Sequence, residues 1–312
     1  MLILLLTFIL SNGIIGIIRI MNKKGASKIM IKLCAFADES SGKLDGQIDA
    51  LVRNNIPYLE IRSVNGKNVA DITEEEALQI YDDLAKNGLA VWSIGSPLGK
   101  VNVDVDFDEY IKKVEHVCKI AVILKAKRIR CFSFFKAYND REKVLEYMQK
   151  MVDVASKYDV LMCHENEKDI YGDTLARTLD ILDNVKGLEC VYDPANFLQV
   201  GESDSIKTLN ALHSRANYFH IKDVIVKTGE LVPAGEGDGN IDKLVADIKD
   251  DKVLTLEPHL AIFDSYKSID DTEMKNKYVF ASNEEAFDCA VNSLKKILVK
   301  NGYKEIKGAF VK

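Results

Sequence analysis

Residues 160–197 read VLMCHENEKDIYGDTLARTLDILDNVKGLECVYDPANF and contain one strand–helix–strand repeat in outline. Two short apolar runs, Val160–Glu165 and Leu188–Tyr192, enclose a longer interval of helical character. Strands buried on both faces of a parallel sheet are typically apolar at nearly every position, as these runs are. The first run ends at Glu165, and Asp193 directly follows the second. The repeat predicts two parallel strands joined by a crossover helix.

The same alternation extends to both sides of this repeat. From Met30 onward, apolar runs alternate with segments of helical periodicity, and the runs are Ile31–Ala37, Tyr58–Val64, Ala90–Ile94, Arg128–Phe134, Val160–Glu165, Leu188–Tyr192, Tyr218–Ile221 and Val253–Leu256. One helical interval opens with Thr73 and a glutamate three residues later, which predicts a capping box. Strict alternation predicts right-handed parallel crossovers, and its repetition predicts closure into a (β/α)₈ TIM barrel of the α/β class.

An open, doubly wound sheet is the alternative architecture. Such folds carry a glycine-rich, phosphate-binding turn after the first strand, and none follows the run Ile31–Ala37. The glycine cluster at residues 235–239 lies late in the chain and contains Glu236 and Asp238. Because these acidic side chains oppose phosphate binding, we interpret the cluster as a turn.

Composition limits the function classes. The chain has 312 residues and a net charge of −6, which disfavours a nucleic-acid partner because such proteins need a basic surface. Its six cysteines form no Cys-x-x-Cys pair. A large apolar chain with scattered thiols is typical of a reducing compartment, so we expect a cytoplasmic protein.

The N-terminus differs from the rest of the chain. Residues 1–18 carry no charge and precede Arg19, Lys23, Lys24 and Lys28. We therefore divide the chain into an apolar extension, residues 1–29, and one catalytic barrel domain, residues 30–312. The extension is interpreted as a mis-assigned start, as a membrane anchor that would leave the barrel in the cytoplasm, or, least favoured, as a signal peptide. Membrane contact is expected only if the anchor is real.

Four successive runs end in a residue that could bind a metal: Glu165, Asp193, His220 and Glu257. The carboxyl ends of barrel strands meet at the face that carries the active site. One such acid alone could equally be a helix N-cap, but four on adjacent strands would need a compensating cation. Three carboxylates and one imidazole suit Mn²⁺, Mg²⁺ or Co²⁺, with Zn²⁺ as a further option. His164 alternates with Glu165 and should point away from the barrel axis.

Five further residues near the strand ends are predicted to bind substrate: Asn196, Lys222, His259, Glu60 and Arg62. His259 has the same strand parity as Glu257, so its side chain could face the same pocket. Arg62 likewise has the parity of Glu60, and an ion pair between these two is the alternative. Lys222 could also be a solvated loop residue.

Residues from about Ile31 to Gly302 resemble the xylose-isomerase-like barrel superfamily. This group includes sugar-phosphate isomerases and epimerases, ketose 3-epimerases, inosose dehydratase and the endonuclease IV group. The motifs that carry the resemblance are His164-Glu165-Asn166, Asp193-Pro194-Ala195-Asn196-Phe197, His220-Ile221-Lys222-Asp223, Leu256-Glu257-Pro258, Leu59-Glu60-Ile61-Arg62 and Ser93-Ile94-Gly95-Ser96-Pro97.

The resemblance implies one divalent metal ion held by Glu165, Asp193, His220 and Glu257. It implies a sugar, sugar phosphate or polyol as substrate, with Glu165 and Glu257 moving protons through a metal-stabilised enediolate. A dimer or tetramer is a further expectation by analogy with the family.

One position departs from the family pattern. Ketose epimerases commonly have Asp-x-x-His after the sixth strand, whereas this chain has Asn196, which cannot become a cation. This weakens both ketose 3-epimerisation and the endonuclease IV interpretation. A dehydratase of the inosose or dehydroshikimate type is the main alternative, and a non-catalytic sugar-binding barrel is a third.

Overall fold

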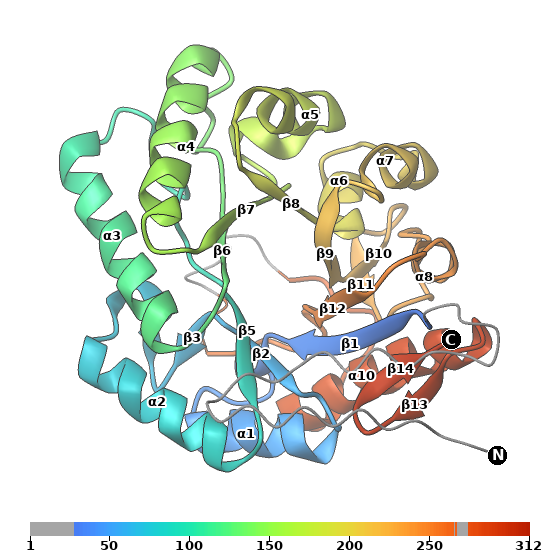
Figure 1. Cartoon of the computed structure of the whole chain (residues 1–312). Coiled ribbons are helices and arrows are strands. Elements are labelled where there is room, and N and C mark those ends of the chain that lie inside the picture. The colour runs from blue at the N-terminus through green and yellow to red at the C-terminus, as the bar shows by residue number, and fades with distance from the viewer. Residues whose placement is uncertain (1–27, 265, 267–273) are drawn as a thin grey trace, which may run out of the picture.

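The computed structural model describes residues 28–264, 266 and 274–312. Figure 1 shows a ring of strands surrounded by helices. The barrel strands are β1 (Met30–Ala35), β2 (Tyr58–Ile61), β5 (Ala90–Ile94), β6 (Arg128–Cys131), β7 (Leu161–Glu165), β8 (Glu189–Tyr192), β9 (Ala216–Ile221) and β12 (Lys252–Leu256). Each pairs in parallel with its neighbours, and β12 pairs with β1 from Ile31↔Lys252 to Ala35↔Leu256. The ring is therefore closed, which confirms the TIM barrel and excludes the open sheet.

The outer helices form where the sequence has amphipathic periodicity. They are α1 (Leu44–Arg53), α2 (Glu74–Lys86), α3 (Phe107–Ile123), α4 (Arg141–Ser156), α5 (Leu175–Asn184), α6 (Pro194–Gln199), α7 (Ser205–Leu212), α8 (Ile241–Ala246) and α10 (Asn283–Lys300). The predicted capping box begins α2: Thr73 Oγ1 accepts from the Glu76 amide at 3.1 Å, and Glu76 Oε2 accepts from the Thr73 amide at 2.8 Å. The apolar faces of these helices pack on the barrel, and each helix contributes to the main apolar core, while Ala195 and Leu198 of α6 belong to a smaller cluster.

Short hairpins were not predicted. β13 (Lys304–Ile306) and β14 (Ala309–Val311) form an antiparallel pair, and β14 also pairs with the start of β1. β3 (Ser63–Val64) pairs with β4 (Lys67–Asn68), and β10 (Asp223–Ile225) with β11 (Glu230–Val232). Three predicted runs extend past the ends of β1, β2 and β6, because apolar residues continue into the loops above the barrel.

The glycine cluster at residues 235–239 forms a turn around a carboxylate. The amides of Gly235, Gly237 and Gly239 donate to Asp223 at 2.8, 3.1 and 2.9 Å, and the Val224 amide donates at 3.0 Å. A Cβ atom on Gly237 would lie 2.3 Å from Asp223 Oδ1, so only glycine fits there. An internal carboxylate thus takes the place that a phosphate would occupy in a nucleotide-binding loop.

Of the predictions made from composition, the structure bears on the cysteines but not on the cellular location. All cysteines are free thiols, as expected of a chain without a disulfide framework. Among the described residues, no helix is both long enough and apolar enough to cross a bilayer. The apolar stretch 1–18 lies outside the described residues, so its interpretation and the cytoplasmic location stay predictions.

Candidate metal and proton-transfer site

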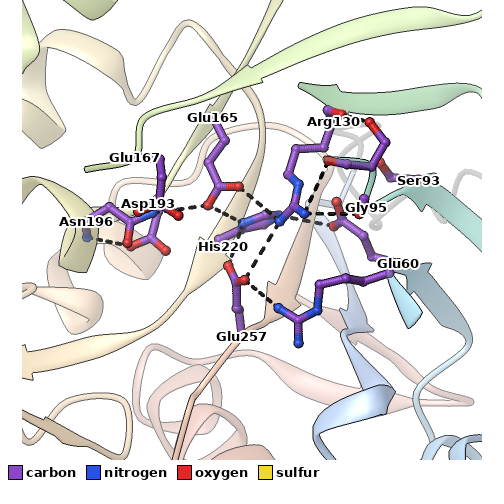
Figure 2. A network of polar contacts seen from close by, with 12 residues as sticks. Glu60, Ser93, Gly95, Arg130, Glu165, Glu167, Asp193, Asn196, His220 and Glu257 are labelled. Atoms are coloured by element: carbon purple, nitrogen blue, oxygen red, sulfur yellow. Dashed lines mark hydrogen bonds and ion pairs between the residues drawn. The ribbon is translucent and has the colours of Figure 1, made fainter. Parts of the chain in front are cut away.

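The four predicted ligands meet at the carboxyl end of the barrel. Glu165 is the last residue of β7, Asp193 follows β8, His220 lies in β9 and Glu257 follows β12. Their candidate ligand atoms all lie within 4.8 Å of one another, and all four side chains are buried. Figure 2 shows them pointing toward one another from adjacent strands. Neighbouring parallel strands end at the same edge, which is why residues far apart in sequence converge here.

The imidazole of His220 occupies the middle of this cluster. Its Nδ1 lies 2.9 Å from Glu165 Oε1 and 3.0 Å from Glu257 Oε2. Burial by itself would lower the pKa of His220, but the charges of Glu165, Glu60 and Glu257 raise that pKa well above its usual value. The negative charge of the surrounding glutamates therefore favours the protonated form of the imidazole.

Asp193 is both a helix N-cap and a member of the candidate metal site, two roles that the sequence analysis treated as alternatives. Its Oδ1 accepts from the Asn196 amide at 3.0 Å and caps the N-terminus of α6. Its Oδ2 lies 3.1 Å from Lys222 Nζ. Burial raises the pKa of Asp193 to about 7, although the ammonium group of Lys222 opposes this shift. The carboxylate is thus both an N-cap and a buried group that a further cation would stabilise as an anion.

Glu60 contacts the imidazole from the opposite side. His220 Nε2 lies 3.2 Å from Glu60 Oε2, and the hydroxyl of Tyr218 donates to Glu60 Oε1 at 2.8 Å. Burial would raise the pKa of Glu60, but interaction with His220 lowers it below its usual value. An ionised Glu60 accepts from Nε2–H and leaves Nδ1 facing the cluster, the arrangement that orients a metal-binding histidine.

Arg62 does not pair with Glu60, so that alternative is wrong. Arg62 follows the last residue of β2, where strand alternation ends, and its guanidinium turns toward the loop after β1. Its Nε and NH2 atoms donate to both oxygens of Asp38, at 2.9 and 3.0 Å, and NH1 donates to Glu257 Oε1 at 2.9 Å. These contacts fix the position of Glu257. Substrate binding by Arg62 and by Glu60 stays untested.

A second buried arginine, Arg130 in β6, was missed by the sequence reasoning. Its NH1 lies 3.2 Å from Glu165 Oε2 and 3.8 Å from Glu257 Oε1, while NH2 donates to the Gly95 carbonyl at 3.1 Å. The signal was present in the sequence, because Arg128 and Arg130 interrupt a run assigned as buried on both faces. An arginine in such a run needs a carboxylate partner, and the partners here are the two candidate proton-transfer glutamates.

The other predicted substrate residues border the cluster. Asn196 Nδ2 donates to Glu165 Oε1 at 3.2 Å. The His259 amide donates to Glu39 Oε2 at 2.7 Å, and His259 Nε2 lies 3.6 Å from Glu257 Oε1. Burial raises the pKa of Glu39, which the sequence reasoning also missed, to about 8, against the opposing charge of Arg62. Their roles toward a substrate remain predictions.

His164 points away from the cluster, as strand alternation predicts. Its Nε2 lies 3.0 Å from Ser133 Oγ, and its ring packs against Gly172, where a Cβ atom would come within 2.5 Å of the imidazole. Burial lowers the pKa of His164 to about 3. The residue is a neutral core histidine behind the site.

The residues present fit a divalent cation. Three carboxylates and one imidazole nitrogen converge within one coordination sphere, a donor set that suits Mn²⁺, Mg²⁺, Co²⁺ or Zn²⁺. Burial raises the pKa of Asp193, and the charges of Glu165, Glu60 and Glu257 raise the pKa of His220. A cation at this position would stabilise the carboxylate of Asp193 and would offset the negative charge around His220.

Comparison with known proteins identifies the fold. A family model described as xylose isomerase-like TIM barrel matches residues 48–270. D-Allulose 3-epimerase from Methylomonas sp. superposes with a TM-score of 0.67 at 16% identity, covering 86% of this chain and 98% of that one. IOLI protein with a bound zinc atom gives 0.67 at 16%, covering 86% and 99%. The probable 3-DHS dehydratase AsbF from Bacillus anthracis gives 0.64 at 15%, covering 85% and 98%.

At these identities the solved structures establish the fold alone. No curated protein sequence matches the chain. The family model, in contrast, spans well over half of the sequence and includes all four clustered residues, Glu165, Asp193, His220 and Glu257. The chain belongs to the xylose isomerase-like TIM barrel family.

Proposed function

We propose that the chain is a divalent-metal-dependent isomerase or epimerase of sugars or sugar-like carbonyl compounds. The observation that carries the proposal is the placement of Glu165 and Glu257 beside the same nitrogen, Nδ1, of one imidazole, His220. Two carboxylates flanking one centre are what a reaction needs that removes a proton from carbon and returns it elsewhere. The metal would be held by these three residues and Asp193.

The chain's own residues would divide the chemistry between them. A bound divalent cation would stabilise the negative charge that develops on oxygen when the neighbouring C–H bond is broken. Glu165 or Glu257 would accept the proton, and the other carboxyl group would deliver one to the product. Arg130 and Arg62 would keep the two carboxylates in place, since they donate to the oxygens of Glu165 and Glu257 that do not contact His220.

The charge balance favours a substrate without a phosphate group. Each described cation next to the cluster already contacts a carboxylate: Arg62 contacts Asp38 and Glu257, Arg130 contacts Glu165, Lys222 contacts Asp193, and Lys100 contacts Glu167. A phosphate would have to displace one of these pairs. An uncharged sugar or polyol needs only hydrogen-bond partners, and the carboxylates and Asn196 offer these.

One observation favours a dehydratase as the second candidate. The buried ammonium group of Lys222, 3.1 Å from Asp193 Oδ2, could donate a proton to a departing hydroxyl. Proton removal by a glutamate is common to both reactions, but only a dehydratase releases water. Mass spectrometry of the product separates them, because an isomerase conserves the mass of the substrate and a dehydratase does not.

The test is turnover of ketoses, aldoses and inososes by purified protein supplied with Mn²⁺, Mg²⁺, Co²⁺ or Zn²⁺. We expect a product of unchanged mass, and loss of at least about 100-fold in kcat in Glu165→Gln and Glu257→Gln. Glu75→Gln, on the exposed face of α2, is the matched control and should keep wild-type activity. Turnover that survives both active-site substitutions would refute the assignment of the two glutamates.

A further inference from the structure

A cavity lies at the end of the barrel opposite to the candidate site. It has a volume of about 400 Å³ and is lined by residues at the starts of the strands, among them Lys32, Tyr58, Trp92, Arg128, Asn217 and Lys252. Its inner wall adjoins the apolar cluster of Cys34, Cys163, Val191, Tyr218 and Val253. A cavity of this size and lining can enclose a small organic molecule.

Two aromatic rings form one wall of this cavity. The ring centroids of Tyr58 and Trp92 lie 5.3 Å apart, and Trp92 also meets the ring of Tyr218 edge-on at 6.3 Å. The buried indole Nε1 of Trp92 has no hydrogen-bond acceptor among the described residues. The planes of Tyr58 and Trp92 are inclined at 43°, so the wall offers two apolar ring surfaces at an angle, with an unused donor next to them.

Two cations border the aromatic wall without a carboxylate partner. The guanidinium carbon of Arg128 lies 3.8 Å from the centroid of the Trp92 ring, and Arg128 Nε donates to Asn217 Oδ1 at 2.6 Å. Lys32 Nζ donates to the hydroxyl of Tyr58 at 3.1 Å. In the described part of the chain, no carboxylate lies within ion-pair distance of either group. The cations beside the candidate metal site, in contrast, each contact a carboxylate.

Acidic residues at the rim do not neutralise these two cations. Asp251 accepts from the Met30 amide at 2.8 Å, and Glu189 lies 3.5 Å from Asn217 Nδ2. The other lining lysine, Lys252, is paired with Asp250 at 3.2 Å. A half-buried cation without a counter-charge is unfavourable, so an anion placed between Arg128 and Lys32 would be stabilised.

We propose that this cavity binds a small aromatic or otherwise planar carboxylate. The ring would pack against the side chains of Tyr58 and Trp92, and the carboxylate would meet Arg128 and Lys32. The site is independent of the catalytic proposal, because it lies at the other end of the barrel and shares none of the four candidate metal ligands.

Trp92 makes the proposal directly testable, since it is the only tryptophan in the sequence. Titration of the full chain with benzoate should change the fluorescence of Trp92 with a dissociation constant of about 1 mM or tighter. Benzamide, which has the ring without the charge, and acetate, which has the charge without the ring, should each bind at least about tenfold more weakly. Calorimetry provides a second readout of the same titrations.

Variants distinguish this cavity from the catalytic end. Arg128→Gln and Lys32→Met should each weaken benzoate binding by about tenfold or more, whereas Lys127→Gln, at the exposed neighbouring position, should not. His220→Ala, in the metal cluster, should leave benzoate binding unchanged. Equal binding of benzoate and benzamide, no response of Trp92 to benzoate, or unchanged affinity in folded Arg128→Gln and Lys32→Met proteins would each overturn the proposal.

Discussion

At the scale of single residues, Glu60 contacts the imidazole of His220, which its position in the sequence did not predict. Its carboxylate links Tyr218 to His220 Nε2, so it is a positioning residue for the imidazole rather than a partner of Arg62. Groups that receive the second N–H of a metal-binding histidine fix its tautomer and its orientation. The affinity of the site for a metal should therefore depend on a residue that does not touch the metal.

We expect Glu60→Gln to lower the affinity for Mn²⁺ or Zn²⁺ by about 10- to 100-fold. The amide can donate to Nε2 and would favour the tautomer whose proton lies on Nδ1, facing the ligands. Calorimetric titration of the metal-free protein measures the effect directly. Tyr218→Phe is the graded control, because it removes one hydrogen bond but keeps the carboxylate. An affinity for Glu60→Gln equal to that of the wild type would contradict the positioning role.

His164 should make the protein sensitive to acid. Its pKa is lowered by burial to about 3, below the usual value of 6.5, so the unfolded chain binds a proton that the folded chain excludes. The contribution of this residue to stability is complete above pH 6.5. It falls by about 1.4 kcal/mol per unit as the pH decreases toward 3.

The measurement for His164 is urea unfolding between pH 5 and pH 8, in the wild type and in His164→Gln. Glutamine cannot take up a proton, so the variant should lose less stability on acidification, even if it is less stable at neutral pH. His213→Gln is the control, since His213 is half-buried at the end of α7. Identical slopes in wild type and His164→Gln would show that His164 is not responsible.

At the scale of elements, the loop between β11 and α8 is built around one carboxylate. Asp223 receives four backbone N–H groups, three of them from the glycine cluster at residues 235–239. Asp223 is adjacent in sequence to Lys222, whose ammonium group contacts Asp193 in the metal cluster. The loop therefore anchors the end of β9 from which both His220 and Lys222 reach the site.

Asp223→Asn should destabilise the fold by about 3 kcal/mol, because the asparagine NH₂ group would oppose backbone donors and leave them unsatisfied. Denaturant unfolding measures the loss. Asp247→Asn, in an exposed pair with Lys243, is the matched substitution and should change stability by less than about 1 kcal/mol. Equal stabilities of the two variants would contradict the anchoring role of Asp223.

At the scale of the whole molecule, sequence patterns predicted the features that recur from one strand to the next and missed contacts that occur only once. The eight strands recur with similar length and composition, and the ligands recur at strand ends, so both could be predicted. Arg130 interrupts a predicted apolar run and Glu39 follows another, but neither run contains the partners of these residues. Their partners are distant in sequence, and only the closed barrel brings them together.

Alternation rules failed where a strand ends. Arg62 was assigned the parity of Glu60, but β2 stops at Ile61 and the chain turns toward β3. The hairpin of β13 and β14 was missed because β13 is polar and exposed and, among the described strands, pairs only with β14. In contrast, His164 lies within a regular strand, and alternation placed it correctly behind the site.

The central claim is that Glu165, Asp193, His220 and Glu257 form one divalent-metal site. Elemental mass spectrometry of protein purified without chelator tests it most directly, with Glu165→Gln and His220→Ala measured beside the wild type. We predict about one Mn, Co, Zn or Mg ion per wild-type chain and its loss in both variants. Wild-type protein without bound metal, whose melting temperature no divalent ion raises, would contradict the claim.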